Sequence, residues 1–174
     1  MRFSAYVPFH ACLSVAPFLR GFAVLSAVLD KAEAFAETKK ISTDVLVNAR
    51  LAPDMLSLVG QVQRASDTAK NAAGRLSGTP APSFPDEEKT LEDLRNRIRM
   101  TVDYLSSVTP EALEGSETRP VNLKAGKVDV HYSGQDYLTD FALPNFYFHL
   151  TTAYAILRHN GVEVGKRDFL GPQG

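Results

Sequence analysis

Apolar residues in the first part of the chain recur at helical spacing. Steps of three or four residues separate Phe18, Phe22, Leu25, Leu29, Ala32 and Ala36. This spacing places them on one side of an α-helix, while the charged residues from Asp30 onward fall largely off that side. The pattern predicts a helix from about Ser14, or slightly earlier, to about Lys39, with Pro17 tolerated within its first turn.

The second predicted helix is interrupted. Residues 45–51 have a helical pattern, but Pro53 lacks an amide donor and clashes with the preceding turn. From Asp54 the apolar stripe resumes and continues to Leu76. Gly78 is suited to end this helix, because glycine adopts the left-handed conformation readily.

The third predicted helix carries basic residues beside its apolar stripe. Thr90 and Asp93 resemble a capping box with Asp in place of the usual Glu. The stripe that follows consists of Leu91, Leu94, Ile98, Val102 and Leu105. The pattern places Arg95, Arg97 and Arg99 mostly on the outer side of this stripe. Acidic residues lie close by, so we interpret these arginines as a solvated helix face and not as a nucleic-acid-binding patch.

The periodicity changes before the last helix. Residues 119–132 alternate between apolar and polar around a central Ala-Gly, which predicts a small β-hairpin or an extended crossover. A densely apolar helix follows Ser133, with a kink expected at Pro144 and an end at Gly161. Four amphipathic helices predict an all-α, antiparallel four-helix bundle, which we expect to occupy residues 1–174 as one domain.

Composition narrows the possible functions. The chain has 174 residues and a net charge of −1, so no excess of positive charge is available for nucleic acid or an anionic membrane. Its single cysteine, Cys12, excludes an intrachain disulfide and a cysteine-cluster metal site. Pro17 and Arg20 interrupt the apolar stretch from Ala11 to Leu29. We therefore interpret it as part of a helix in a cytoplasmic protein, not as a signal peptide or a membrane span.

Polar residues interrupt the apolar last helix and mark the candidate site. Asn145 and His149 are four residues apart and Thr152 follows three residues later, so the three share a helix face. Such a polar stripe needs partners, because burying an unsatisfied polar group is costly. We interpret it as part of a pocket between the second and fourth helices, with His149 as the candidate base or ligand. Alternatively, His149 is a structural core residue that bonds to the second helix or to a backbone carbonyl.

The break in the second helix supplies the other predicted wall of this pocket. Asn48, Arg50 and Asp54 flank Pro53. In the functional interpretation, Asn48 orients His149, Arg50 binds an anionic group and Asp54 holds Arg50. In the alternative, these polar side chains cap free backbone groups and form a local Arg50–Asp54 ion pair.

Two segments, Asn48 to Met55 and Asp140 to Val162, resemble signatures of a bacterial family of unknown function. That family is grouped with the DinB/YfiT-like four-helix bundles, and the resemblance covers nearly the whole chain. It implies the bundle fold and a homodimer. Many proteins of the superfamily bind nickel or zinc through three histidines, one from the second helix and two from a His-x-x-x-His pair on the fourth, and some are thiol-dependent S-transferases or isomerases.

The chain departs from that three-histidine pattern. Superfamily members often carry a Leu-Arg-x-x-Gly-like segment eight residues after the second histidine of the pair. Leu157 to Gly161 is such a segment here, so the resemblance matches His149 to the second histidine and Asn145 to the first. The second helix offers no histidine. One imidazole with amides is a weaker set of ligands for a transition metal than three imidazoles.

We therefore expect a degenerate metal site that binds a small ligand, and no cofactor. One alternative is a metal-dependent transferase or hydrolase in which His149 and Asp54 hold nickel or zinc. Another is a non-catalytic structural or dimerisation module. The sequence leaves open whether the protein is an enzyme.

Overall fold

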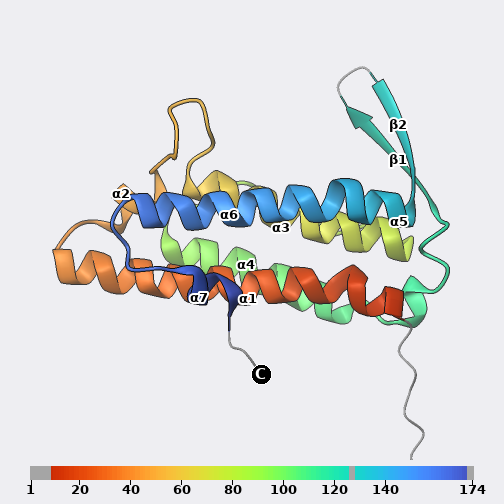
Figure 1. The fold of residues 1–174 in the computed structure, drawn as a ribbon, viewed down its shortest axis with the longest axis horizontal. Coiled ribbons are helices and arrows are strands. Elements are labelled where there is room, and N and C mark those ends of the chain that lie inside the picture. Colours follow the sequence, from red (N-terminus) through yellow and green to blue (C-terminus); the bar gives the residue numbers. More distant parts are fainter. Residues whose placement is uncertain (1–8, 126–127, 172–174) are drawn as a thin grey trace, which may run out of the picture.

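Four long helices lie side by side along a common axis (Figure 1). They are α1 (Phe9–Lys39), α3 (Leu58–Ser77), α4 (Leu91–Ser107) and α6 (Leu143–His159). This computed structural model describes residues 9–125 and 128–171; side chains are described from Ser14 onward, except that of Ala125. The predicted all-α bundle with a hairpin before the last helix is confirmed. None of the described helices is long and apolar enough to cross a lipid bilayer.

The helices form two parallel pairs that run antiparallel to each other. One pair is α1 with α6 and the other is α3 with α4 (Figure 1). The parallel direction of α3 and α4 requires residues 78–90 to run back along α3 before α4 begins. Accordingly, Glu88 accepts a hydrogen bond from Gln63, near the start of α3. The predicted proline-rich surface connection therefore spans much of the length of a helix.

The apolar stripes meet in one core. The first-helix residues Phe18, Phe22, Leu25 and Leu29 are fully buried there. The edge of the Phe146 ring from α6 packs between Phe18 and Phe22, with ring centroids 5.0 and 5.2 Å away. The first helix begins at Phe9, so Pro17 lies inside it and the prediction that Pro17 belongs to its first turn is wrong. The start of α4 and the end of α3 follow the sequence signals. Gly78 ends α3 with a φ of 73°, and Thr90 and Asp93 form both halves of a capping box at α4.

The second predicted helix is divided more widely than a proline kink would require. A short helix, α2 (Thr43–Val47), is followed by an irregular connection, and α3 begins only at Leu58. Ser42 caps α2 through its side chain. The chain also has a 3₁₀ turn, η1 (Glu111–Leu113), and short helices α5 (Gly134–Asp136) and α7 (Lys166–Leu170).

The hairpin and the start of the last helix lie together at one end of the bundle (Figure 1). Strands β1 (Pro120–Ala125) and β2 (Val128–Ser133) pair antiparallel, and the predicted Gly126 turn lies outside the described residues. The last helix opens with a wide π-helical turn, η2 (Tyr137–Ala142), which ends before Pro144, the predicted place of a kink. Pro144 then falls in the first turn of α6, where its missing N–H is tolerated.

The expectation that the arginines of α4 form a solvated face is wrong for Arg97. Arg99 is exposed, and Arg95 forms ion pairs with residues of α1. Arg97 is fully buried instead, because residues 84–88 of the connection cover it. Its guanidinium also lies over the Phe84 ring.

Candidate functional site

A hollow of about 320 Å³ lies between α3, the last helix and the hairpin. From α3 it is lined by Arg64, Asp67, Thr68, Asn71 and Arg75. From η2 and α6 it is lined by Tyr137, Phe141, Asn145 and His149. From β1 it is lined by Asn122, Leu123 and Lys124. The hollow contains most of the polar side chains that join α3 to α6.

Helical spacing explains why these residues meet. On the last helix, steps of four residues separate Tyr137, Phe141, Asn145 and His149. On α3, steps of three and four separate Gln61, Arg64, Thr68, Asn71 and Arg75. This second set is a polar stripe beside the apolar stripe of the same helix. It is the sequence signal that could have located the second wall of the site.

His149 is held by Gln61 in one tautomer. The Gln61 amide nitrogen donates to the carbonyl of Leu56 at 3.1 Å, which leaves its oxygen to face His149. Nδ1 of His149 lies 2.8 Å from that oxygen, so Nδ1 carries the proton. Nε2 therefore presents a lone pair, and it has no hydrogen-bond partner among the described residues.

His149 is also kept neutral. Burial, assisted by the positive charge of Arg64, lowers the pKa of His149 below its ordinary value. A neutral imidazole of this tautomer can accept a hydrogen bond or a proton at Nε2 near neutral pH. The surroundings of His149 therefore suit a base or an acceptor, not a permanent cation.

Of the other predicted polar residues on α6, the structure brings one into the hollow. The Asn145 amide donates to the Thr68 hydroxyl at 2.9 Å across the α3–α6 contact. Thr152 is buried, donates to the carbonyl of Phe148 in its own helix, and does not line the hollow. Asn145 and His149 thus share the site, and Thr152 lies apart from it.

The structure does not bring the predicted residues around Pro53 to the hollow. Asn48, Arg50 and Asp54 are exposed in or beside the connection between α2 and α3. Asn48 donates to the carbonyl of Asp44 at 2.9 Å, and Arg50 donates to the carbonyl of Met55. None of the three lines the hollow, whose α3 wall comes from residues 64–75. A role for them in ligand binding stays a prediction.

The charges around the hollow are unevenly paired. Arg64 forms ion pairs with Asp67 at 3.0 Å and with Asp86. At the hairpin end, Arg75 donates to the Tyr137 hydroxyl at 2.9 Å and has no carboxylate partner among the described residues. Lys124 also lines this end. Among the described lining residues, three cations therefore border the hollow, against one carboxylate that is already paired.

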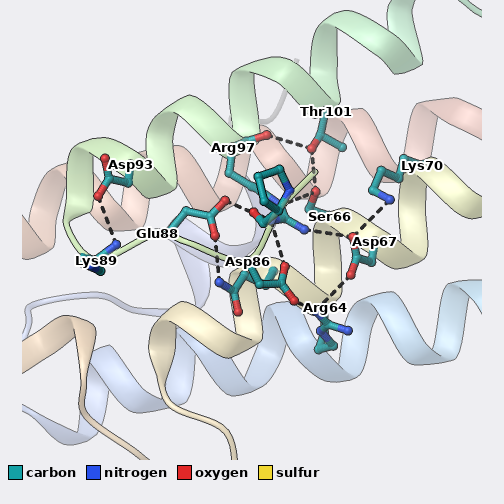
Figure 2. A network of polar contacts seen from close by, with 12 residues as sticks. Arg64, Ser66, Asp67, Lys70, Asp86, Glu88, Lys89, Asp93, Arg97 and Thr101 are labelled. Atoms are coloured by element: carbon teal, nitrogen blue, oxygen red, sulfur yellow. Dashed lines mark hydrogen bonds and ion pairs between the residues drawn. The ribbon is translucent and has the colours of Figure 1, made fainter. Parts of the chain in front are cut away.

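That carboxylate, Asp67, belongs to a buried polar network that Figure 2 shows. Arg97 donates to Asp67 at 2.9 Å, and Lys70 lies 3.2 Å from the same oxygen. The remaining donors of Arg97 serve Ser66, the Pro85 carbonyl, Asp86 and Glu88. Burial acts to lower the pKa of Arg97, but Glu88, Asp67 and Asp86 together outweigh it and raise the pKa. The network holds the back wall of the hollow in place.

The residues present do not fit the three-histidine metal site of the superfamily. Asn145 occupies the first position and is bonded to Thr68, and α3 contains no histidine, so His149 is the one imidazole among the described residues that line the hollow. The nearby charge of Arg64 opposes a bound cation. The described parts of the chain contain no cluster of three His, Cys, Asp or Glu side chains that could hold a metal ion.

Comparison with known proteins places the chain in a family. The domain of unknown function DUF1993 matches residues 12–170. A crystal structure of a DinB family member protein from Shewanella denitrificans is 43% identical with a TM-score of 0.87, and the match covers 97% of this chain and 95% of that one. No curated protein matches the sequence. The chain therefore belongs to the DUF1993 family, within the DinB-like superfamily of helical bundles.

Proposed function

We propose that the protein binds a small polar molecule in the hollow between α3 and α6, with neutral His149 as its hydrogen-bond acceptor. The observation that carries this proposal is the fixed tautomer of His149, whose ring lines the hollow while Nε2 has no partner in the part of the chain that the structure describes. The volume of about 320 Å³ lies at the lower end of the range typical of small-molecule sites.

The arrangement supports acceptance of a proton from a hydroxyl, thiol or amine group of the ligand. Gln61 orients the imidazole and holds the proton on Nδ1, which is the role of the orienting group beside a general base. The charge of Arg64 disfavours a lasting imidazolium. His149 therefore suits a hydrogen bond or a brief proton transfer to a bound group.

Nitrogen NMR of the histidine rings tests this proposal with para-hydroxycinnamate and its neutral amide as probes. We expect one or both probes to shift the His149 Nε2 resonance. In His149→Asn the amide nitrogen can still donate to Gln61, while the acceptor at Nε2 is lost. This variant should therefore weaken binding at least fivefold. His159→Asn, at an exposed position of the same helix, is the matched control and should bind normally.

Failure to shift His149 with either probe, or equal binding by His149→Asn, would reject the proposal. The metal-dependent alternative gives a different result. Nickel or zinc added to metal-free protein would broaden or shift the His149 signals and remain bound after dialysis. The donor set around His149 gives this alternative no specific support.

We also propose that the protein is a homodimer, on the basis of exposed aromatic residues of α6. Phe148 is 55% exposed and Tyr147 is 38% exposed, which is unusual for large rings in a helix of this bundle. Light scattering after gel filtration measures the mass directly. Phe148→Glu should shift a dimer to monomer while preserving the helical spectrum, and a wild-type monomer would reject the proposal.

A further inference from the structure

Resting on the proposed function, we propose that the ligand is an aromatic acid whose carboxylate or phosphate is held by Arg75 and Lys124 at the hairpin end of the hollow. The inference concerns the chemical class of the ligand. It depends on which donors are already used, which cations lack a partner, and which apolar surface lies beside them.

Arg75 presents an oriented guanidinium with donors to spare. One of its N–H groups bonds to the Tyr137 hydroxyl at 2.9 Å, and the guanidinium lies 5.6 Å from the centre of the Tyr137 ring. Tyr137 is only 1% exposed, so it is a fixed anchor. A guanidinium has five N–H donors in a planar fork that matches the two oxygens of a carboxylate or phosphate. Most of those donors are free here.

Because Arg64 is already paired, an anion is expected to bind at the end of the hollow that contains Arg75 and Lys124. Arg64 already binds the carboxylates of Asp67 and Asp86. No ion pair links Arg75 or Lys124 to an acidic residue within the described residues. Cations without an ion pair among the described residues therefore lie between the C-terminal part of α3 and strand β1, where Lys124 is the cross-strand neighbour of Asp129.

The wall beside Arg75 is aromatic. Phe141 lines the hollow, is 38% exposed and stacks on Tyr137 with ring centroids 5.8 Å apart. The ring centroid of Tyr132, in the hairpin, lies 6.3 Å from the ring centroid of Phe141. An exposed ring next to an oriented cation favours a ligand that places a flat apolar group against the ring and an anion on the cation. The Asn145–Thr68 pair separates this end from His149.

Calorimetric titration at low salt tests the inference with para-hydroxycinnamate, its neutral amide, phenyl phosphate and acetate. We expect para-hydroxycinnamate or phenyl phosphate to bind at least tenfold more tightly than the amide and acetate. Arg75→Met should weaken binding of the aromatic acid at least tenfold, and Arg75→Lys should restore part of the loss. Phe141→Ala should weaken it severalfold. Arg99→Met removes an exposed arginine outside the hollow and should change nothing.

Several outcomes overturn the inference and separate it from the proposed function. If the amide binds as tightly as the acid and shifts His149, the hollow binds a ligand but does not select an anionic group. If Arg75→Met binds the acid like the wild type, the anion lies elsewhere. If neither aromatic acid binds at millimolar concentration, the inference fails. By contrast, an acid that depends on Arg75 but leaves the His149 signals unchanged supports the anion site and rejects the role of His149.

Discussion

Replacing Arg97 with methionine removes the cation around which residues 84–88 close. The Arg97 side chain is fully buried. It donates to Glu88 at 2.9 Å, to Asp86 at 3.0 Å and to the Pro85 carbonyl at 3.0 Å. Methionine keeps a long apolar stem against the bundle but has no donor. The substitution therefore isolates the polar contribution from the packing contribution.

The loss of stability in Arg97→Met depends on which ionic and hydrogen-bond partners each carboxylate retains. Asp86 retains Arg64, and Asp67 retains Arg64 and Lys70. Glu88, 9% exposed, keeps only the hydrogen bond from Gln63 at 2.7 Å among the described residues. Leaving one buried charge without its ionic partner costs about 3–5 kcal/mol. For a chain of this length that loss lowers the melting temperature by about 6–20 °C.

Urea unfolding at pH 7, followed by the helical circular dichroism signal, measures this loss. Glu88→Gln in the Arg97→Met background removes the stranded charge and should recover at least about 1 kcal/mol. Arg97→Lys keeps the charge without the fork and should fall between wild type and Arg97→Met. Arg99→Met, the exposed control, should lie within about 0.5 kcal/mol of wild type. A loss under about 1 kcal/mol in Arg97→Met, or no recovery with Glu88→Gln, would refute this reasoning.

Three further predictions concern other parts of the fold. Because burial and the charge of Arg64 lower the pKa of His149, the unfolded chain binds that proton more tightly. The free energy of unfolding should therefore fall as the pH drops below about 6.5, and Arg64→Met should raise the pKa measured by NMR. Thr90→Ala removes the α4 cap and should cost about 1 kcal/mol in urea unfolding; unchanged stability would contradict the role of the cap. Gly134→Ala should cost about 1–3 kcal/mol because its Cβ would overlap the Ser116 carbonyl oxygen. Gly165→Ala is the control, because its added Cβ would lie 3.9 Å from Oδ2 of Asp168, at ordinary contact distance.

Local signals predicted the helices because their causes are local. The three- and four-residue steps of the Phe18 to Ala36 stripe need only one buried side, and the bundle supplies it. Gly78 and the Thr90 capping box act on backbone groups within a few residues. The parallel direction of α3 and α4 was not predictable in this way, because it depends on where residues 78–90 pack after the helix has ended.

Arg97 shows the same limit at one residue. It precedes the stripe residue Ile98 and lies at the border of the apolar side of α4. Whether a border position is exposed depends on the segment that packs over it. Here the connection brings Asp86 and Glu88 onto the guanidinium and excludes water. Asp86 and Glu88 precede Arg97 by 11 and 9 residues, and neither spacing is typical of residues that meet on a helix or a strand. The sequence pattern therefore does not predict this contact.

The sequence pattern predicted the wall of the candidate site that the last helix supplies, but not the wall that α3 supplies. The four-residue spacing of Asn145 and His149 placed both on one face, and both line the hollow. The sequence pattern predicted their partners near Pro53, where an interrupted helix leaves backbone groups free. The structure pairs them instead with Thr68 and Gln61, within the regular part of α3. The polar stripe of α3 could have indicated these partners. It does so only when it is compared with the polar face of the last helix.

The long connection also determines the charge of the hollow. Asp67 is the one carboxylate among the hollow's described lining residues, and its oxygens are shared by Arg64, Lys70 and Arg97. Residues 84–88 hold Arg97 in that position, so the negative charge of Asp67 is directed into the bundle. At the other end, Arg75 has no carboxylate partner among the described residues. In the proposal above, an anion at the Arg75 end would therefore meet an Asp67 carboxylate whose charge is already paired.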